Sequence, residues 1–208
     1  FRSLIVSDDN YFSLRDCFAA RSRVFNSIAE PSIVQKVLSL NDRVNMLFGL
    51  EQGLSHAEYI MDGDDVYLLE VGMRGGGAYI SSDIIPRVGG LDTAEFLCKI
   101  ACGDLHEMPV LNPTGETAGY VAFYLPGGVV KRMVGIQDVQ NLPYVHRNTL
   151  SSIYVGKKID VAEDKTSRQL LVVSGRNRDE WNARVDRIRS MLSICVETPE
   201  GREAFAIW

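Results

Sequence analysis

Residues His56–Gly77 read HAEYIMDGDDVYLLEVGMRGGG, and this stretch predicts a β-hairpin followed by a glycine-rich loop. Two apolar runs flank an acidic turn around Asp64, which is the pattern of two paired antiparallel strands. Each run carries one glutamate near its middle, Glu58 in the first and Glu70 in the second. A hairpin that only packs on a core needs neither of these charges, so the two glutamates are candidate functional residues.

The register of the predicted hairpin decides where the two glutamates lie. A turn centred on Asp64 places Glu58 opposite Glu70 and Ile60 opposite Leu68. Two faces follow from the alternation of side chains: a polar face with His56, Glu58, Ile60, Leu68, Glu70 and Gly72, and an apolar face with Ala57, Tyr59, Met61, Tyr67, Leu69 and Val71. A two-residue Asp62-Gly63 turn is the alternative, but it mixes the polar face of each strand with the apolar face of the other.

Directly opposed residues on paired strands have Cβ atoms about 5 Å apart, and like charges there are destabilising. The pair therefore needs a shared proton or a cation, and a hard divalent cation bridged by Glu58, Glu70 and phosphate oxygens satisfies it. On the same face, Ile60 and Leu68 would form an apolar wall for a flat ring.

Arg74 and three glycines follow the second strand directly. Arginine offers a bidentate fork to phosphate or carboxylate, and Gly75, Gly76 and Gly77 let backbone N–H groups approach an anion. This order of groups predicts a magnesium–nucleotide site that transfers phosphate. The alternatives are ordinary ones: a strand glutamate is commonly a surface residue, an Arg-Gly-Gly-Gly run is commonly a loop, and His56 fits a structural role as well as a site role.

Composition excludes several classes of protein. The chain has 208 residues, a formal net charge of −5 and 46% hydrophobic residues. The negative charge argues against binding of a nucleic-acid backbone, and we find no apolar run near the roughly 20 residues of a membrane span. The four cysteines include no CxxC pair. Core packing is predicted for Cys98 and Cys102, ahead of a disulfide or a metal site, and reduced thiols fit a cytoplasmic protein.

The organisation along the chain predicts an α+β (α/β) fold in two domains. Helices are expected over 31–49, 92–103 and 181–192, the second with Asp92 as its N-cap and Gly103 as its end. A Pro- and Gly-containing segment at 108–116 marks the boundary, which gives domains 1–108 and 109–208. The second domain is smaller and strand-rich, with a hairpin predicted at Pro126-Gly127-Gly128.

At these residues the sequence resembles the C-terminal half of an ATP-grasp domain, near the branch of the L-amino-acid ligases and carbamoyl-phosphate synthase. The family pattern is a strand Glu, a second Glu twelve residues on, an Asn two later, an Arg two after that, and a glycine-containing loop. Glu58, Glu70 and Arg74 match this pattern, whereas Gly72 stands where many members carry a metal-binding Asn. The resemblance is good over 31–103 and looser beyond. The two lysines and the adenine hinge that the family requires upstream find no counterpart here, which implies the carboxyl-terminal part of a longer enzyme.

The resemblance implies an antiparallel ATP-grasp subdomain with helices, and a ligase that forms C–N bonds through an acylphosphate. Glu58 and Glu70 would hold Mg²⁺, or Mn²⁺ in its place, on the phosphate of ATP. Arg74 and the amides of Gly76 and Gly77 would stabilise the acylphosphate and the oxyanion. Ile60 and Leu68 would contact the nucleotide. The substrates would be small carboxylates and amines, amino acids among them.

Two other classes of function stay open at this point. One is a non-catalytic nucleotide-binding module, which the Gly72 departure favours. The other is the partner of a split enzyme whose N-terminal ATP-grasp half is supplied by the same or a separate chain. The isolated fragment is expected to be inactive. A second copy of the chain, forming a homodimer, is a further open partner. Neither the sequence nor the resemblance names the substrate.

Overall fold

The computed structural model describes residues 2–14, 19–104, 107, 109–160 and 168–208, and the chain divides into two compact units. Unit 1 comprises Phe1–Asp8 and Phe25–Glu116, and unit 2 comprises Asp9–Val24 and Thr117–Trp208. Both units mix helices with antiparallel strand pairs, so the predicted α+β class is confirmed. The domain division at 108/109 stays a prediction. The compact units meet eight residues later, at Glu116/Thr117, and unit 2 also takes in residues 9–24.

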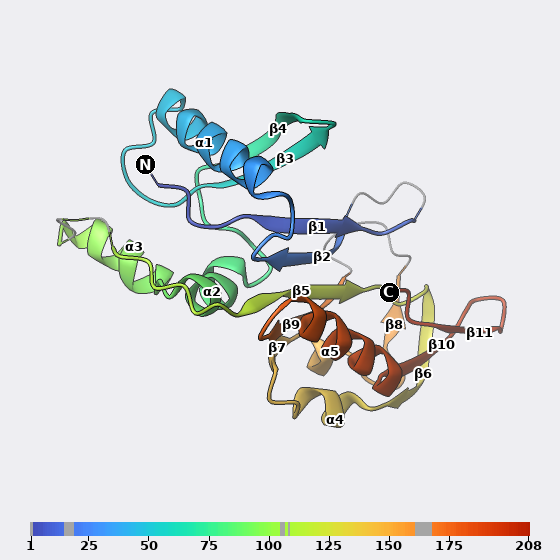
Figure 1. The fold of residues 1–208 in the computed structure, drawn as a ribbon. Helices are drawn as coiled ribbons and strands as arrows, with labels where there is room; N and C mark the ends of the chain where they lie inside the picture. The colour runs from blue at the N-terminus through green and yellow to red at the C-terminus, as the bar shows by residue number, and fades with distance from the viewer. Residues whose placement is uncertain (1, 15–18, 105–106, 108, 161–167) are drawn as a thin grey trace. The chain divides into compact units, whose positions relative to one another are not determined.

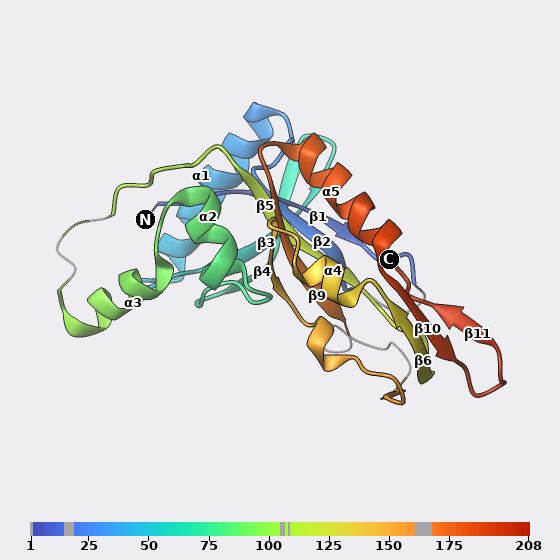
Figure 2. The same ribbon diagram turned by 90° about the horizontal axis from the view of Figure 1, so that it is seen from below.

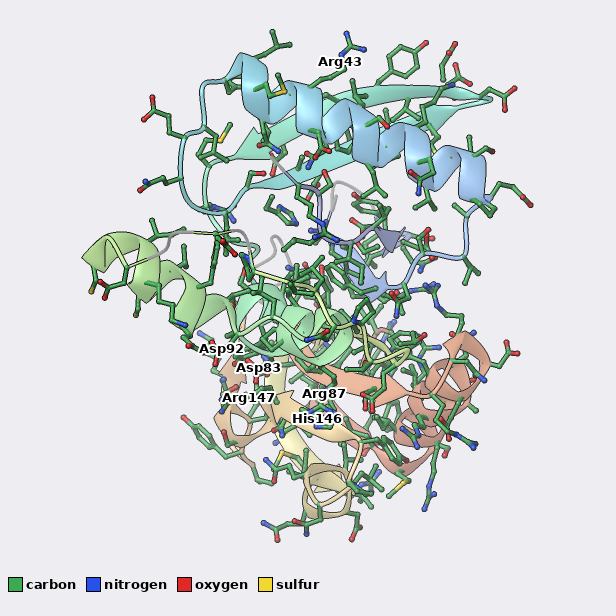
Figure 3. All side chains as sticks on the ribbon, turned by 60° about the vertical axis from the view of Figure 1, so that its left-hand side comes forward. Arg43, Asp83, Arg87, Asp92, His146 and Arg147 are labelled. Atoms are coloured by element: carbon green, nitrogen blue, oxygen red, sulfur yellow. The ribbon has the colours of Figure 1, made fainter. Side chains whose placement is uncertain are left out.

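Unit 1 is built on one long helix, one hairpin and a run of short helices (Figure 1). Its elements are α1 (Pro31–Leu47), β3 (His56–Asp62), β4 (Asp65–Gly72), the π-helix η1 (Ile80–Ile84), α2 (Ile85–Gly89) and α3 (Thr93–Cys102). Pro31 stands in the first turn of α1, where its missing N–H costs nothing. Asp92 caps α3 by accepting from the N–H groups of Ala94 and Glu95, and Gly103 ends it in a left-handed conformation, as the sequence predicted. Figure 3 labels Asp92 at this helix start.

The hairpin lies along α1, and two hydrogen bonds join them (Figure 1). Near the tip, the Lys36 ammonium donates to the Asp64 carbonyl. In the middle, the Tyr59 hydroxyl donates to Asn41 Oδ1 over 3.0 Å. One face of β3 is thus turned toward α1, and the alternation of side chains turns Glu58 to the other face.

The hairpin register confirms one prediction and corrects another. Glu58 pairs with Glu70, as expected. The turn, however, is the two-residue Gly63-Asp64, with Asp62 paired to Asp65, so neither predicted turn is right. The register shifts between Glu58 and Tyr59, because Tyr59 pairs with Leu68 and leaves one extra residue, Leu69, in β4. This is a β-bulge, which inserts one residue into one strand only.

The bulge changes which side chains share a face. Ile60 pairs with Tyr67, not with Leu68, and Leu68 pairs with Tyr59. The predicted polar face with Ile60 opposite Leu68 is therefore wrong beyond Glu58. Tyr67 and Leu69, which were expected to pack on the core, are 52% and 57% exposed.

Unit 2 holds two sheets. The five-stranded sheet has the order β1-β2-β5-β9-β7 and the four-stranded sheet the order β11-β10-β6-β8. Its elements are β1 (Ser7–Tyr11), β2 (Ala20–Phe25), β5 (Thr117–Phe123), β6 (Gly128–Val134), α4 (Ile136–Gln140), β7 (Val145–Asn148), the short 3₁₀ helix η2 (Leu150–Ser152), β8 (Lys158–Ile159), β9 (Gln169–Gly175), α5 (Arg178–Met191), β10 (Ser193–Glu197) and β11 (Glu203–Phe205).

Helix α5 covers the five-stranded sheet, and the core of unit 2 lies between them (Figure 1 and Figure 2). The predicted stripe is confirmed, since Trp181, Val185 and Ile188 are buried against Val121 and Leu171. The Trp181 indole also donates to the Val173 carbonyl over 3.0 Å. The hairpin predicted at Pro126-Gly127-Gly128 is wrong, because β5 and β6 belong to different sheets and this segment carries the chain from one to the other.

The predicted core packing of the two helical cysteines is also wrong for the structure described. Cys98 and Cys102 are both free and exposed on α3, whereas Cys195 is buried in β10. Cys17 lies outside the described residues. Among the residues described, no helix is long and apolar enough to cross a membrane.

Candidate active site

The centre of the candidate site is the pair of carboxylates on neighbouring strands. Glu58 is partly buried, Glu70 is exposed, and the two residues are direct partners in the β3–β4 ladder. Direct partners have Cβ atoms about 5 Å apart. Within the described ranges no group of three or more His, Cys, Asp or Glu residues is arranged to hold a metal ion. Two carboxylates alone still fit Mg²⁺, which is commonly held by one or two protein carboxylates together with substrate phosphates.

The apolar part of the site differs from the prediction. Ile60 is 52% exposed and lies on the same face as Glu58, and its cross-strand partner is Tyr67, which is equally exposed. Leu68 is paired with Tyr59, whose hydroxyl is bonded to α1, so Leu68 belongs to the other face of the ladder. An exposed wall next to the carboxylates therefore exists, but Tyr67 stands where Leu68 was expected.

The glycine loop after β4 is held by its carbonyl groups. Arg74 Nη1 donates to the Gly75 carbonyl over 2.9 Å. The Gly76 carbonyl accepts from Ser81 Oγ at 3.2 Å and from the Ser81 N–H at 3.4 Å. The Gly77 carbonyl accepts from the Ile80 N–H at 2.9 Å. Three successive carbonyl groups are therefore engaged within the protein.

Two of the three glycines are required by close packing. A Cβ atom built on Gly75 would lie 2.3 Å from Ser81 Oγ, and one built on Gly76 would lie 2.9 Å from a methyl carbon of Ile80. His56 closes the other side of Gly76, because its Cδ2 would lie 3.0 Å from that Cβ. A Cβ on Gly77 would meet no atom within 4 Å. His56 is thus a packing neighbour of the loop.

The next two residues adopt a conformation that the sequence does not announce. Ala78 and Tyr79 have φ angles of 51° and 62°, and both are left-handed without being glycine. The left-handed region costs an ordinary residue roughly 1–2 kcal/mol, and such strain concentrates at functional sites. The π-helix η1 begins directly afterwards, and π-turns are also frequent at such sites. No sequence signal marks Ala78, because alanine has no preference for this region.

The chain is similar in structure to several solved proteins. The chain is similar to the L-amino acid ligase from Bacillus licheniformis, with a TM-score of 0.74 and 19% identity over 85% of this chain and 44% of that one. It is similar to phosphoribosylglycinamide synthetase from Anaerococcus prevotii, with a TM-score of 0.73 and 12% identity over 91% of this chain and 48% of that one. It is also similar to biotin carboxylase from Campylobacter jejuni, solved as a β-γ-ATP complex, with a TM-score of 0.60 and 16% identity over 91% of this chain and 44% of that one.

The fold is ATP-grasp-like. No family model matches the sequence, and no curated protein matches it significantly. At identities of 12% to 19% the likeness concerns the fold alone. The chain spans less than half the length of each of these three solved chains.

The ATP-grasp-like frame agrees with the predicted fold, an antiparallel subdomain with helices followed by a strand-rich unit. The structure brings Glu58, Glu70 and Ile60 together on the hairpin, with Arg74 and the glycine loop directly after it. The roles of these residues stay predictions. Sequence reasoning missed the place of Tyr67 opposite Ile60 and the left-handed step at Ala78. It named Ser81 as a candidate for substrate contact or for a helix-surface or capping role, and the structure shows Ser81 bonded to the Gly76 carbonyl.

The packing of the loop yields a first prediction. Gly76→Ala places a methyl group against buried Ile80 and His56, so we expect the loop to shift and the free energy of unfolding of unit 1 to fall by about 1–3 kcal/mol. Gly77→Ala is the matched control, because its methyl group enters open space. Urea unfolding of both variants tests this, and equal stabilities would contradict the packing described.

Proposed function

We propose that this chain forms the carboxyl-terminal part of an ATP-dependent carboxylate–amine ligase that works through an acylphosphate. The observation that carries the proposal is the direct pairing of Glu58 with Glu70, next to Arg74 and a packed glycine loop, in an ATP-grasp-like fold. The similar solved proteins include ligases that form C–N bonds, which supports the general kind of reaction. The substrates we propose are small carboxylates and amines, with amino acids among them.

In the proposed reaction, the terminal phosphoryl group of ATP passes to a substrate carboxylate oxygen and ADP leaves. An amine then forms a C–N bond at the carbonyl carbon, and phosphate leaves with the oxygen. Glu58 and Glu70 would hold Mg²⁺, or Mn²⁺ in its place, against the phosphates. When bound, such an ion neutralises phosphate charge and aligns the transfer.

The glycine loop is suited to stabilising an oxyanion. In a trans peptide the C=O of one residue points away from the N–H of the next, and the described chain has no cis peptide bond. Since the carbonyls of Gly75, Gly76 and Gly77 are bonded to Arg74, Ser81 and Ile80, the N–H groups of the following residues point away from these partners. The amides of Gly76 and Gly77 are therefore not turned toward these three partners, which their proposed role requires.

Arg74 has a double role in the proposal. One N–H, on Nη1, holds the Gly75 carbonyl. A guanidinium carries five N–H donors, so others stay available for the transferred phosphate. The side chain is exposed, and it needs no rearrangement of the backbone to reach a ligand. For the nucleotide ring we propose Ile60 as the contact, and we leave Leu68 out because the bulge assigns it to the other face.

The carboxylate pair gives the first test of the function. Glu58→Gln and Glu70→Gln each remove a negative ligand, so we expect Mn²⁺ affinity of the chain to fall by at least about tenfold. Electron paramagnetic resonance of free Mn²⁺ measures this directly. In the longer enzyme the same variants should lower ADP release.

Glu51→Gln serves as the control for these variants, because Glu51 is an exposed acid outside regular structure. It changes the net charge equally but removes no proposed ligand. If Mn²⁺ binding by Glu58→Gln and Glu70→Gln equalled that of Glu51→Gln, the assignment of the metal site would be wrong.

A third prediction concerns Gly72. A Cβ atom at this position would lie 3.5 Å from the Arg74 side chain, which is an ordinary contact, so the backbone can carry a side chain here. Gly72 pairs with His56 two residues beyond the glutamates on the side away from the turn, so alternation puts it on their face of the ladder. We expect Gly72→Asn to add an oxygen ligand and tighten Mn²⁺ binding, whereas Gly72→Ala adds bulk without a ligand. A calorimetric titration that found the two variants equal would count against a metal at this edge.

A fourth prediction concerns activity. The lysines and adenine hinge implied by the resemblance find no counterpart in this chain, and the chain spans under half of the similar solved chains. We therefore expect the 208-residue chain alone to release no ADP from ATP with any mixture of amino acids. If this chain alone released ADP and Glu58→Gln abolished that release, the lysine and adenine contacts would have to come from the chain itself, and the prediction would be wrong.

One observation favours a second candidate, a nucleotide-binding module or split-enzyme partner without turnover. Gly72 supplies no metal ligand, and Ile60 and Met73 are exposed apolar residues beside the site. Nucleotide binding without ADP release in every context, including the complete enzyme or a mixture with a candidate partner half, distinguishes this candidate from the ligase. A cytoplasmic location and a homodimer stay predictions.

A further inference from the structure

Tyr59 stands next to Glu58 in β3, but its side chain is directed to the opposite face of the hairpin. Its hydroxyl donates to Asn41 Oδ1 on α1 over 3.0 Å. Tyr59 is also the first residue beyond the bulge, since the register shifts between Glu58 and Tyr59. The register of the hairpin changes at Tyr59, and the Tyr59 hydroxyl ties this point of β3 to α1.

Asn41 is itself held in place from the other side. Its Nδ2 donates to Ser3 Oγ over 2.8 Å, and Ser3 Oγ donates to Asp42 Oδ1 over 2.6 Å. The Ser3 N–H donates to the same carboxylate oxygen over 2.8 Å. The hydrogen bonds thus run in one direction, from Tyr59 through Asn41 and Ser3 to a carboxylate. Hydrogen bonds in such a series polarise one another, and here they fix the orientation of the Asn41 amide.

Burial, and to a smaller extent the charge of Asp42, raise the pKa of Tyr59 above its ordinary value.

The position of the bulge decides whether the two glutamates face each other. Outward from the bulge, the two-residue turn pairs Tyr59 with Leu68 and Ile60 with Tyr67. If that register continued inward by one more step, Glu58 would pair with Leu69 instead of Glu70. A slip of one residue turns side chains to the other face of a strand, so the carboxylates would separate. A bond at Tyr59 opposes this slip because it fixes the first residue of the outer register.

We propose that Tyr59 is a positioning residue for the metal site, which it serves by locking the bulge through Asn41 so that Glu58 stays opposite Glu70. The inference rests on the proposed function of the two carboxylates. It makes the metal site depend on Tyr59, which lies on the other face of the hairpin, and on Asn41 and Ser3.

Tyr59→Phe removes the hydroxyl and keeps the ring. We expect Mn²⁺ binding to weaken by about tenfold, the lower limit for lost supporting groups around a metal. Tyr154→Phe is the matched control, since Tyr154 is 61% exposed and lies in unit 2. Asn41→Leu removes this bond and also the bond from Asn41 Nδ2 to Ser3 Oγ, so it should weaken binding at least as much, and the double variant should bind like Asn41→Leu. A role confined to stability would leave the Mn²⁺ affinity of the folded chain unchanged.

Nuclear magnetic resonance reports the register directly. In the wild type, cross-strand contacts should join Glu58 to Glu70, and in Tyr59→Phe a share of the signal should move to Glu58 and Leu69. If wild-type Mn²⁺ binding does not depend on Glu58, the proposed function fails. If it depends on Glu58 but Tyr59→Phe and Asn41→Leu bind as tightly as Tyr154→Phe, the positioning role fails and the metal site stands.

Discussion

The function proposed for unit 1 depends on one constraint: two carboxylates occupy directly opposed positions on neighbouring strands. Like charges in this arrangement cost up to about 1 kcal/mol relative to neutral pairs. A hairpin selected for stability alone would place an apolar or oppositely charged residue at one of the two positions. Glu58 and Glu70 are instead partners in the ladder, beside an arginine and a loop of three glycines. The cost is understandable if a cation is shared at this point, because the same closeness that repels two carboxylates lets them bind one ion.

The hairpin satisfies two demands that conflict in a regular ladder. A two-residue turn at Gly63-Asp64 sets one register at the tip, and the opposition of the glutamates needs another. One additional residue in β4, Leu69, reconciles them, and bulges are common next to active sites for this reason. Most side chains of β4 are exposed, so packing of these side chains contributes little to fixing the position of the bulge. The contacts of α1 at Asp64 and Tyr59 restrict it from both ends of the outer segment.

The sequence predicted most of the elements and the central pair, and it failed where one residue of register decides. Capping at Asp92, the helix end at Gly103 and the stripe of α5 could be predicted because each depends on neighbours within a few positions. The pairing of Glu58 and Glu70 was found from alternation, but the bulge was not, since alternation assumes one continuous register and the hairpin has two, joined at the bulge. The separation of β5 from β6 and the left-handed Ala78 depend on distant contacts that local preferences do not report.

The two faces of the hairpin differ in their contacts. The face with Tyr59 is tied to α1, whereas Ile60, on the face with Glu58, is 52% exposed. The loop repeats this arrangement at the level of the backbone: its carbonyls are bonded to Arg74, Ser81 and Ile80, and its N–H groups are turned the other way. In both cases polar groups on one side are satisfied within the protein, which is the arrangement that the proposed ligand site requires. Such preorganisation lowers the cost of ordering the site when charge develops on it. Strain at Ala78 and Tyr79 is consistent with this view, because a backbone held for binding need not lie at its own energetic minimum.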